Sequence, residues 1–395
     1  MNFSFSFDVA AWIWIAVVFL SSLMALWARF KPIWLAGSAV ASPKDDADDM
    51  PSTRMPKVSV IVYTVTEEEE ILSYLDSVMN QDYPDYEVII VNEGGAETSS
   101  DLSERLLKKY PERLYVTFIP PEAHSLSRRK LAQTVGMKAA KGDIVITTMS
   151  NCTIPSDRWL SEMTRPFISD TGTDVVLGYS HIDFDDMHGA GKWYREMDAT
   201  LTACQWIGAA YNRHPYRGDG MNLAFRRELF FHHKGYAKTI HLMNGDDDLF
   251  LREFMNADNT RLSISPLSIL TSGWGVSGNR IHAEIKERYQ FTARFLPRFP
   301  FLRAGLGSMM QWIALGAAVA AAIYGLPSLV PACIAVALIG ILWMTEICIY
   351  RRTARRLDSV CLWWSLPWFL LWHPIGNAVF KLRRHRRIRK NYTFA

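Results

Sequence analysis

The sequence has few cysteines, and their positions exclude two common kinds of architecture. Five occur in 395 residues, with no Cys-x-x-Cys pair and no Cys/His ligand spacing. Structural zinc sites and disulfide frameworks need such spacing, so we expect neither, and a reduced domain facing the cytoplasm is the simplest interpretation. The net charge of +3 is also small and indicates no class of partner by itself. The basic residues are informative through their distribution, because they gather at the ends of apolar runs.

The first apolar run, residues 9–27, lacks both a basic leader and a small-residue cleavage site. It is also too long for the core of a signal peptide, so we interpret it as a retained transmembrane helix. Arg29 and Lys31 follow the run, whereas Asp8 precedes it. The positive-inside rule then predicts an N-terminus outside the cell and a cytoplasmic domain after the helix.

Two more apolar runs, residues 306–326 and 329–350, are joined by a turn that contains Pro327. Arginines close the second of them, again on the cytoplasmic side: Arg351, Arg352, Arg355 and Arg356. The three runs agree on one orientation. They predict a multi-pass protein of the cell membrane, in a bacterium the inner membrane.

The last apolar run, residues 360–380, differs because Pro367 and Pro374 interrupt it and a tail rich in Arg and Lys follows. A single crossing would place this tail outside, against the positive-inside rule. We therefore predict an interfacial or re-entrant helix, with a cytoplasmic tail that binds anionic lipid. Nucleic acid is not an expected partner, because no recognition fold accompanies the tail. The expected divisions are a helix at 1–35, a linker at 36–56, a catalytic domain at 57–300, two transmembrane helices at 301–350 and the interfacial segment at 351–395.

Between the apolar runs, segments with strand and helix patterns alternate. β-branched residues dominate the expected strands, which are residues 58–63, 87–92, 114–119 and 144–148. The expected helices are residues 67–81, 102–107 and 127–141. This alternation predicts an α/β fold with a mainly parallel sheet and helices on both faces. Ligands bind such sheets at the carboxyl ends of the strands, which here are near residues 63–67, 92–95 and 148–152.

Three consecutive aspartates, Asp246, Asp247 and Asp248, follow Gly245 late in this domain. Adjacent carboxylates repel one another, and their pKa values are driven apart, so that one can serve as a general base. The apolar residues that come next predict the buried start of a helix. A solvated acidic turn is the alternative interpretation.

Several short motifs in this domain are informative through their order and spacing. In chain order they occupy residues 58–70, 81–94, 127–142, 154–159, 220–226, 245–250 and 286–289. Together they resemble the family 2 glycosyltransferases with a GT-A fold, in their membrane-anchored form. The resemblance extends over about residues 56–300. It implies the GT-A fold and an inverting transfer of a sugar from a nucleotide-sugar donor to a lipid-linked or cell-surface polysaccharide acceptor.

The resemblance also implies roles for individual residues. Asp247 would be the base, with Asp246 beside it tuning its pKa. The donor side would be formed by Glu67, Glu93, Lys130 and Asn151. The acceptor and diphosphate side would be formed by Asn222, Lys286, Arg288 and Tyr289. Three alternatives stay open: residues 67–70 also suit a solvated first helical turn, residues 128–130 also suit a surface cluster at the start of a helix, and residues 286–289 also suit a basic amphipathic helix on the membrane surface.

The sequence departs from the family pattern where the family holds a metal. The position of the Asp-x-Asp motif that binds Mg²⁺ or Mn²⁺ is occupied by Met149, Ser150 and Asn151. One amide oxygen holds a hard cation weakly. A literal Asp-x-Asp at residues 183–185 follows another expected strand, residues 175–182, and we interpret it as a solvated acidic turn. The sequon at residues 151–153 has no use in a cytoplasmic domain.

Two hypotheses about activity follow. In the first, the protein is an active transferase in which Arg128, Lys130 or Arg288 supplies the charge that the metal would provide. In the second, it is a catalytically impaired scaffold that binds a nucleotide or a partner. The retained aspartates favour the first hypothesis, and the missing metal carboxylates favour the second.

Overall fold

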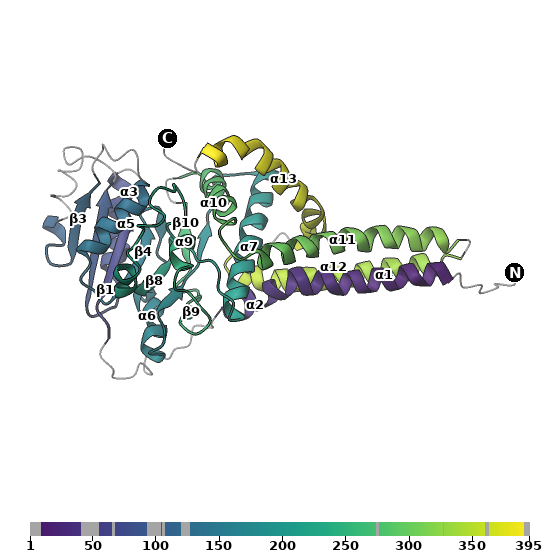
Figure 1. The fold of residues 1–395 in the computed structure, drawn as a ribbon, viewed down its shortest axis with the longest axis horizontal. Coiled ribbons are helices and arrows are strands. Elements are labelled where there is room, and N and C mark those ends of the chain that lie inside the picture. Colours follow the sequence, from purple (N-terminus) through teal and green to yellow (C-terminus); the bar gives the residue numbers. More distant parts are fainter. Residues whose placement is uncertain are drawn as a thin grey trace.

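The computed structural model describes residues 9–40, 55–64, 68–92, 104, 107–119, 127–273, 276–326, 328–359 and 363–390. It divides into an α/β part and a bundle of long helices that projects from it (Figure 1). Glu67 and Glu93, both predicted to bind the donor, lie outside the described residues.

The α/β part is built on a seven-stranded sheet with the order β3-β2-β1-β4-β8-β6-β9. Its strands are β1 (Val58–Tyr63), β2 (Tyr86–Asn92), β3 (Leu114–Phe118), β4 (Ile144–Met149), β6 (Val175–Leu177), β8 (Leu223–Arg226) and β9 (Thr260–Leu262). All neighbours pair in parallel except β8, which is antiparallel to β4 and β6. Strand β1 is buried along its whole length, as its β-branched sequence predicts. The predicted mainly parallel α/β sheet is confirmed.

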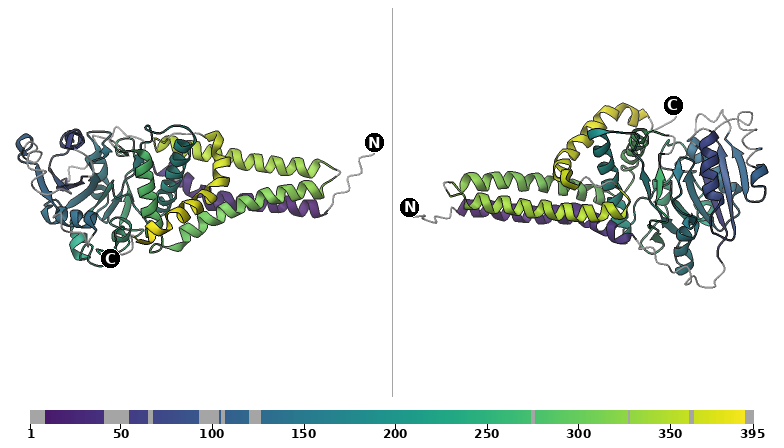
Figure 2. Two further views of the ribbon diagram at one scale, coloured as in Figure 1. Left: turned by 90° about the horizontal axis from the view of Figure 1, so that it is seen from above. Right: turned by 180° about the vertical axis from the view of Figure 1, so that it is seen from behind.

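Helices connect and flank these strands. They are α3 (Glu68–Met79), α5 (Arg128–Ala139), α6 (Trp159–Ser169), α7 (Gly189–Tyr211), α8 (Arg227–His232), α9 (Asp248–Leu251) and α10 (Gly278–Thr292). Helix α5 packs against β1, β2 and β3. Helices α7 and α10 lie on the side of the domain that faces the bundle (Figures 1 and 2).

A second, three-stranded sheet has the order β5-β10-β7, formed by Cys152–Thr153, Leu270–Ser272 and Ser180–Ile182. The sequence predicts one strand over residues 175–182, and this is wrong because β6 and β7 belong to different sheets. The chain changes sheets beside Gly178, whose N–H donates to the carbonyl of Asn222. A Cβ at Gly178 would lie 2.5 Å from the Asn222 side chain, so this close passage requires glycine.

The bundle contains three helical segments that are long and apolar enough to span a membrane. The first, Val9–Ala39, consists of α1 (Val9–Ala25), a π-helical turn η1 (Leu26–Phe30) and α2 (Lys31–Ala39). The others are α11 (Arg298–Tyr324) and α12 (Val330–Arg356). The predicted linker at 36–56 begins too early, because α2 continues to Ala39. Helix α2 packs so closely on α7 that a Cβ at Gly208 would lie 2.1 Å from the Pro32 oxygen.

The last helix, α13 (Leu366–Lys390), follows the short turn η3 (Trp363–Ser365) and contains Pro374 in its interior. It leaves the base of the bundle and turns back over α7 and α10 (Figures 1 and 2). Exposed apolar side chains recur every three or four residues along η3 and α13, at Trp364, Trp368, Trp372, Ile375, Val379 and Leu382. This spacing places them on one outward face. The interfacial position of α13 stays a prediction.

Candidate active site

The three aspartates lie where the loop after α8 enters α9. Asp247 is the N-cap of this helix, since its Oδ1 accepts a hydrogen bond from the Asp248 N–H at 2.8 Å. Gly245 has a φ of +92°, a conformation that favours glycine. Asp246, Asp247 and Asp248 are only 2%, 6% and 1% exposed. The solvated acidic turn is therefore wrong, and these carboxylates require counter-charges.

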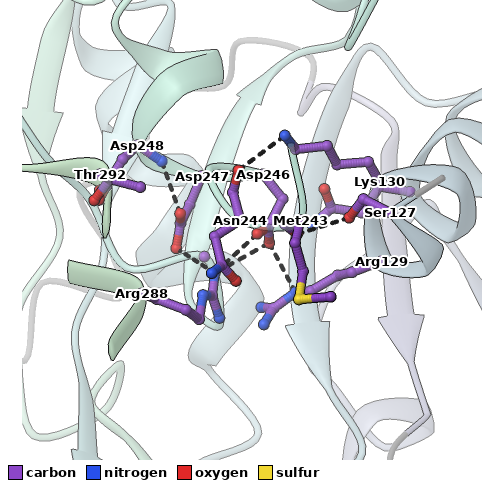
Figure 3. A network of polar contacts seen from close by, with 12 residues as sticks. Ser127, Arg129, Lys130, Met243, Asn244, Asp246, Asp247, Asp248, Arg288 and Thr292 are labelled. Carbon is purple, nitrogen blue, oxygen red and sulfur yellow. Dashed lines mark hydrogen bonds and ion pairs between the residues drawn. The ribbon is translucent and has the colours of Figure 1, made fainter. Parts of the chain in front are cut away.

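Two arginines from distant parts of the chain neutralise the first two carboxylates (Figure 3). Arg129, on α5, lies 2.7 Å from the Asp246 carboxylate. Arg288, on α10, lies 3.0 Å from Asp246 and 2.9 Å from Asp247. Burial alone would raise the pKa of Asp246, but these guanidiniums lower it below its ordinary value. Asp246 is thus an ionised anchor for both arginines, and Arg288 links it to Asp247.

Asp248 belongs to a separate group of contacts. Its Oδ2 accepts hydrogen bonds from Arg217 at 3.0 Å and from Thr292 at 2.6 Å. Burial, which outweighs the opposing charge of Arg217, raises the pKa of Asp248 to about 7. Arg217 also lies 3.9 Å over the ring of Tyr289 and donates to the Tyr289 carbonyl at 3.1 Å. Asp248 and Tyr289 therefore join α9 to α10.

The predicted role of Lys130 in donor binding needs correction. Its ammonium group donates to the carbonyls of Thr239, Leu242 and Asn244 at 2.6, 3.1 and 2.9 Å. These contacts use all three N–H donors, and the side chain is fully buried. Burial lowers the pKa of Lys130 to about 8, although Asp246 and Asp247 act in the opposite direction. Lys130 holds the loop that leads to the aspartates (Figure 3).

Asn222 also has a supporting place instead of the predicted one at the acceptor. Its Oδ1 accepts a hydrogen bond from the indole N–H of Trp159 at 3.1 Å. Its Nδ2 donates to the carbonyls of Tyr179 and Ser268 at 2.9 and 2.8 Å. Asn222 is completely buried and fixes the segments around β8 to one another.

The carboxyl end of β4 does not fit a divalent cation. Met149, Ser150 and Asn151 stand at this end, all buried, and none offers a carboxylate. Within the described ranges, no group of three or more His, Cys, Asp and Glu residues could hold a metal ion. Hard cations need several oxygen ligands. The structure places Asn151 at the strand end where the sequence predicts it, and its role as a donor contact stays a prediction.

The literal Asp-x-Asp lies elsewhere, at the far end of β7. Its second carboxylate, Asp185, is exposed and pairs with Lys192 at 2.8 Å. This position agrees with a solvated acidic turn. The sequon at residues 151–153 is inaccessible, because its Asn151 side chain is only 4% exposed.

The three predicted residues of α10 separate into different groups. Arg288 joins the aspartates, and Tyr289 joins Arg217. Lys286 lies instead 2.6 Å from Asp198 on α7, together with His282 at 2.8 Å. His282, Lys286 and Arg288 are thus paired with buried carboxylates, which a helix that merely rests on a membrane surface would not require.

A cavity of about 470 Å³ connects these groups, and α7, α10, α11 and α13 line it. Asp247, Arg288, Lys286 and His373 contribute charged or polar groups to its wall. Its apolar lining includes Ile182, Leu201, Trp206, Met221, Ile285 and Phe301. A cavity with apolar walls on which several polar and charged groups converge is typical of a binding site. Asp247, the residue predicted to be the base, therefore reaches this cavity.

Sequence reasoning misses three residues around this site. Arg217 and Asp198 stand in no recognisable motif, and their partners are 31 or more residues away in sequence. His282 does carry a signal, because it precedes Lys286 by four residues and so shares a face of α10 with it. That spacing could have predicted a common partner.

Comparisons with known proteins agree with this geometry. Residues 11–374 match the model of glycosyl transferase family 21. Glycosyltransferase AglE of Haloferax volcanii is 30% identical over 145 residues, which cover 36% of this chain and 45% of that protein. Putative glycosyltransferase EpsH of Bacillus subtilis is 29% identical over 189 residues, with coverages of 45% and 49%. The chain thus spans about half the length of these curated relatives.

The fold is similar to that of the mannosyltransferase PcManGT from Pyrobaculum calidifontis, solved with GDP-Man and Mn²⁺. The TM-score is 0.54 at 18% identity, and the similarity covers 92% of this chain and 99% of that one. The predicted GT-A glycosyltransferase is confirmed, with family number 21 where the sequence resemblance names family 2. The chain belongs to glycosyltransferase family 21.

Proposed function

We propose that this protein is an inverting glycosyltransferase that moves a sugar from a nucleotide-sugar donor to a lipid-linked or glycan acceptor. One observation carries the proposal: the Asp247 carboxylate lines a largely apolar cavity that is also bounded by α11, one of the candidate membrane spans. A base at this position would be within reach of the hydroxyl of an acceptor that enters the cavity.

Asp247 is the general base of this reaction. Its Oδ1 is oriented by the N–H of Asp248, and its Oδ2 pairs with Arg288. As the acceptor oxygen attacks the anomeric carbon, its proton moves to the Asp247 carboxylate. The bond from the anomeric carbon to the diphosphate breaks with inversion, and the nucleoside diphosphate leaves with the electron pair.

Arg288 and Arg129 supply positive charge for this leaving group. Both guanidiniums are held beside Asp246, whose depressed pKa keeps the anchor ionised. A diphosphate that approaches Arg288 competes with Asp247 for the same N–H groups. Donor binding therefore releases Asp247 to accept a proton. Fixed cationic groups of this kind stabilise charge that develops in a transition state.

The acceptor fits the cavity if it carries an apolar chain. The wall near Phe301 belongs to α11, and the wall near His373 belongs to α13. A lipid-linked acceptor can place its chain along these helices and its hydroxyl beside Asp247. The orientation predicted from the basic residues puts this site on the cytoplasmic side of the cell membrane.

The experiment is hydrolysis or transfer with a panel of UDP- and GDP-sugars by the purified full chain in detergent. We expect turnover of one donor, and loss of turnover with retained nucleotide binding in Asp247→Asn. Asp258→Asn, which removes an exposed carboxylate paired with Arg213, is the matched control. Unchanged turnover in Asp247→Asn would remove Asp247 from the base role.

A second candidate function is a nucleotide-binding or partner-binding scaffold without catalysis. The observation that favours it is the absence of carboxylates at Met149, Ser150 and Asn151, at the end of β4. Nucleotide binding without turnover of any donor, with and without an acceptor lipid extract, would favour the scaffold. Turnover that depends on Asp247 would exclude it.

The orientation is tested separately with single cysteines. We expect Ser328→Cys, between α11 and α12, to react with an impermeant maleimide on intact cells. Asp258→Cys, in the α/β part, should react only after permeabilisation. The opposite pattern would reverse the proposed orientation.

A further inference from the structure

A series of buried polar contacts connects the helix bundle to the active site. It begins at Glu346 on α12, whose carboxylate accepts a hydrogen bond from Gln311 of α11 at 3.3 Å. Gln311 in turn accepts one from Arg29 at 3.2 Å. Arg29 stands in the π-helical turn η1. Polar residues buried among apolar helices are costly unless paired, and here each has a partner on another helix.

The series continues into α13 through His373. The Nδ1 of this ring lies 3.3 Å from the Arg29 guanidinium, and its Nε2 lies 2.7 Å from Oδ1 of Asp198. A guanidinium only donates and a carboxylate only accepts. These two contacts assign the tautomer, with the proton on Nε2 and a lone pair on Nδ1 directed at Arg29; the Asn377 side-chain amide also lies 3.0 Å from Nε2. Burial lowers the pKa of His373, although Asp198 acts in the opposite direction. The lowered pKa also favours the neutral form of the ring.

Asp198 distributes the connection to α10. Its Oδ2 accepts hydrogen bonds from His282 at 2.8 Å and from Lys286 at 2.6 Å, while its Oδ1 accepts one from His373. Although burial opposes ionisation, His282, His373 and Lys286 hold the pKa of Asp198 well below its usual value. One buried carboxylate on α7 thus joins α10 and α13.

The opposite side of α10 holds the active site. At 3.6 residues per turn, a residue two positions after Lys286 lies about 200° around the helix. That residue is Arg288, which pairs with Asp246 and Asp247. Helix α10 is therefore held on two faces, by Asp198 on one and by the catalytic aspartates on the other. A rotation that loosens one set of contacts moves the other.

We propose that Asp198 and His373 are positioning residues, which fix α10 against α7 and α13 so that Arg288 meets Asp247. The inference rests on the proposed function, because it concerns the geometry of that same site. Neither residue needs to touch the donor. Their effect on turnover is exerted through Arg288.

A double-mutant cycle with Asp198→Asn and Arg288→Lys tests this, with donor turnover as the readout. Alone, Asp198→Asn should lower kcat about tenfold; in the Arg288→Lys background its effect should shrink to about twofold or less, because residues that act through one another are not additive. Equal fold-losses in both backgrounds would overturn the proposal. Asp170→Asn, which removes the ion pair with Arg261 at a remote edge, should leave kcat unchanged.

Substitution of His373 provides a second readout. In His373→Gln, the amide can still donate to Asp198 and accept from Arg29, but it does not titrate. We expect His373→Gln to keep clearly more turnover at pH 7 than His373→Leu, which should lose it. In the wild type, protonation of Nδ1 as the pH falls would direct a proton at Arg29, with Asp198 and Lys286 as the other charges that face the ring. Because burial lowers the pKa of His373, this protonation occurs at a pH below the ordinary imidazole range, and there the wild-type rate should fall more steeply than that of His373→Gln.

Equal losses in the Gln and Leu variants, or none in either, would contradict the positioning role. If the wild type turns over no donor, the proposed function fails. The same double-mutant cycle is then measured by the unfolding temperature of the purified full chain. If the two substitutions lower the unfolding temperature additively, the inference is overturned. If the wild type is active and the cycle is additive, only this inference fails.

Discussion

Gly220 lies directly against the proposed base: a Cβ built on it would be 2.9 Å from the Asp247 Cβ and 3.0 Å from Asp247 Oδ2. That oxygen is the one that pairs with Arg288. Gly220→Ala should therefore displace the carboxylate from its partner and from the cavity. Misplacement of a reacting group by about 1 Å can cost about 100-fold in rate, and we expect a loss of this order in kcat. The measurement is donor turnover by the purified variant.

Gly316→Ala on α11 is the control for this substitution, because nothing lies within 4 Å of a Cβ there. It should leave turnover unchanged. A Gly220→Ala protein with normal kcat would mean that the position of Asp247 is not critical.

The pKa of Asp246 predicts how stability depends on pH. Its folded value lies below the unfolded one of about 3.9, so at low pH the unfolded state binds the proton more readily. The contribution of Asp246 to the free energy of unfolding is therefore present above about pH 4. It is lost as the pH falls through the pKa that Asp246 has in the folded state. Asp246→Asn should lower the unfolding temperature at pH 7.

The difference in unfolding temperature between the wild type and Asp246→Asn should become smaller as the pH is lowered from 5 toward 3. Thermal unfolding at a series of pH values measures it. Asp258→Asn, at an exposed ion pair, serves as the reference substitution. A difference that stays constant over this range would mean that Asp246 does not titrate with a depressed pKa.

Removal of Lys130 should destabilise the loop before the aspartates. Lys130→Met leaves the carbonyls of Thr239, Leu242 and Asn244 without their buried donor. Each unsatisfied group costs about 1–3 kcal/mol, so the unfolding temperature should fall and turnover with it. Lys138→Met, at an exposed position of the same helix, should change neither. Full activity in Lys130→Met would show that the loop keeps its place without this side chain.

Metal chelation should leave the reaction rate unchanged. The end of β4 provides Met149, Ser150 and Asn151 instead of carboxylates, and Arg129 and Arg288 stand beside the acidic cluster. We expect equal donor turnover with EDTA, Mg²⁺ or Mn²⁺. Restored carboxylates in Met149→Asp with Asn151→Asp should make nucleotide binding respond to Mn²⁺. A wild-type rate that vanishes with EDTA would contradict the charge-replacement role of the arginines.

The sheet can be predicted from the sequence because its signal is local. Residues 58–63 show no regular alternation of apolar and polar positions, and valine and isoleucine dominate them. This pattern is typical of a strand buried on both faces. The burial of the three aspartates is not a local property. It depends on Arg288, which is 41 residues away from Asp247, and only the resemblance to known transferases brings the two together.

Lys130 and Asn222 show why some predicted site residues have other tasks. Each is a polar residue inside a motif, and such residues are readily assigned to a ligand. Both instead satisfy buried backbone carbonyls, and these partners depend on the tertiary path of loops that sequence patterns do not encode. The split of residues 175–182 between two sheets has the same origin, since it depends on the approach of Asn222 to Gly178.

The cavity wall formed by α11 and α13 has a consequence for kinetics. If the acceptor is lipid-linked, as proposed above, it would diffuse in the plane of a bilayer, and the enzyme would respond to its mole fraction in the membrane instead of its molar concentration. Dilution of a vesicle with inert phospholipid would then slow transfer even though the bulk concentrations of enzyme, donor and acceptor stay the same. For the water-soluble donor, the same dilution would leave the apparent affinity unchanged.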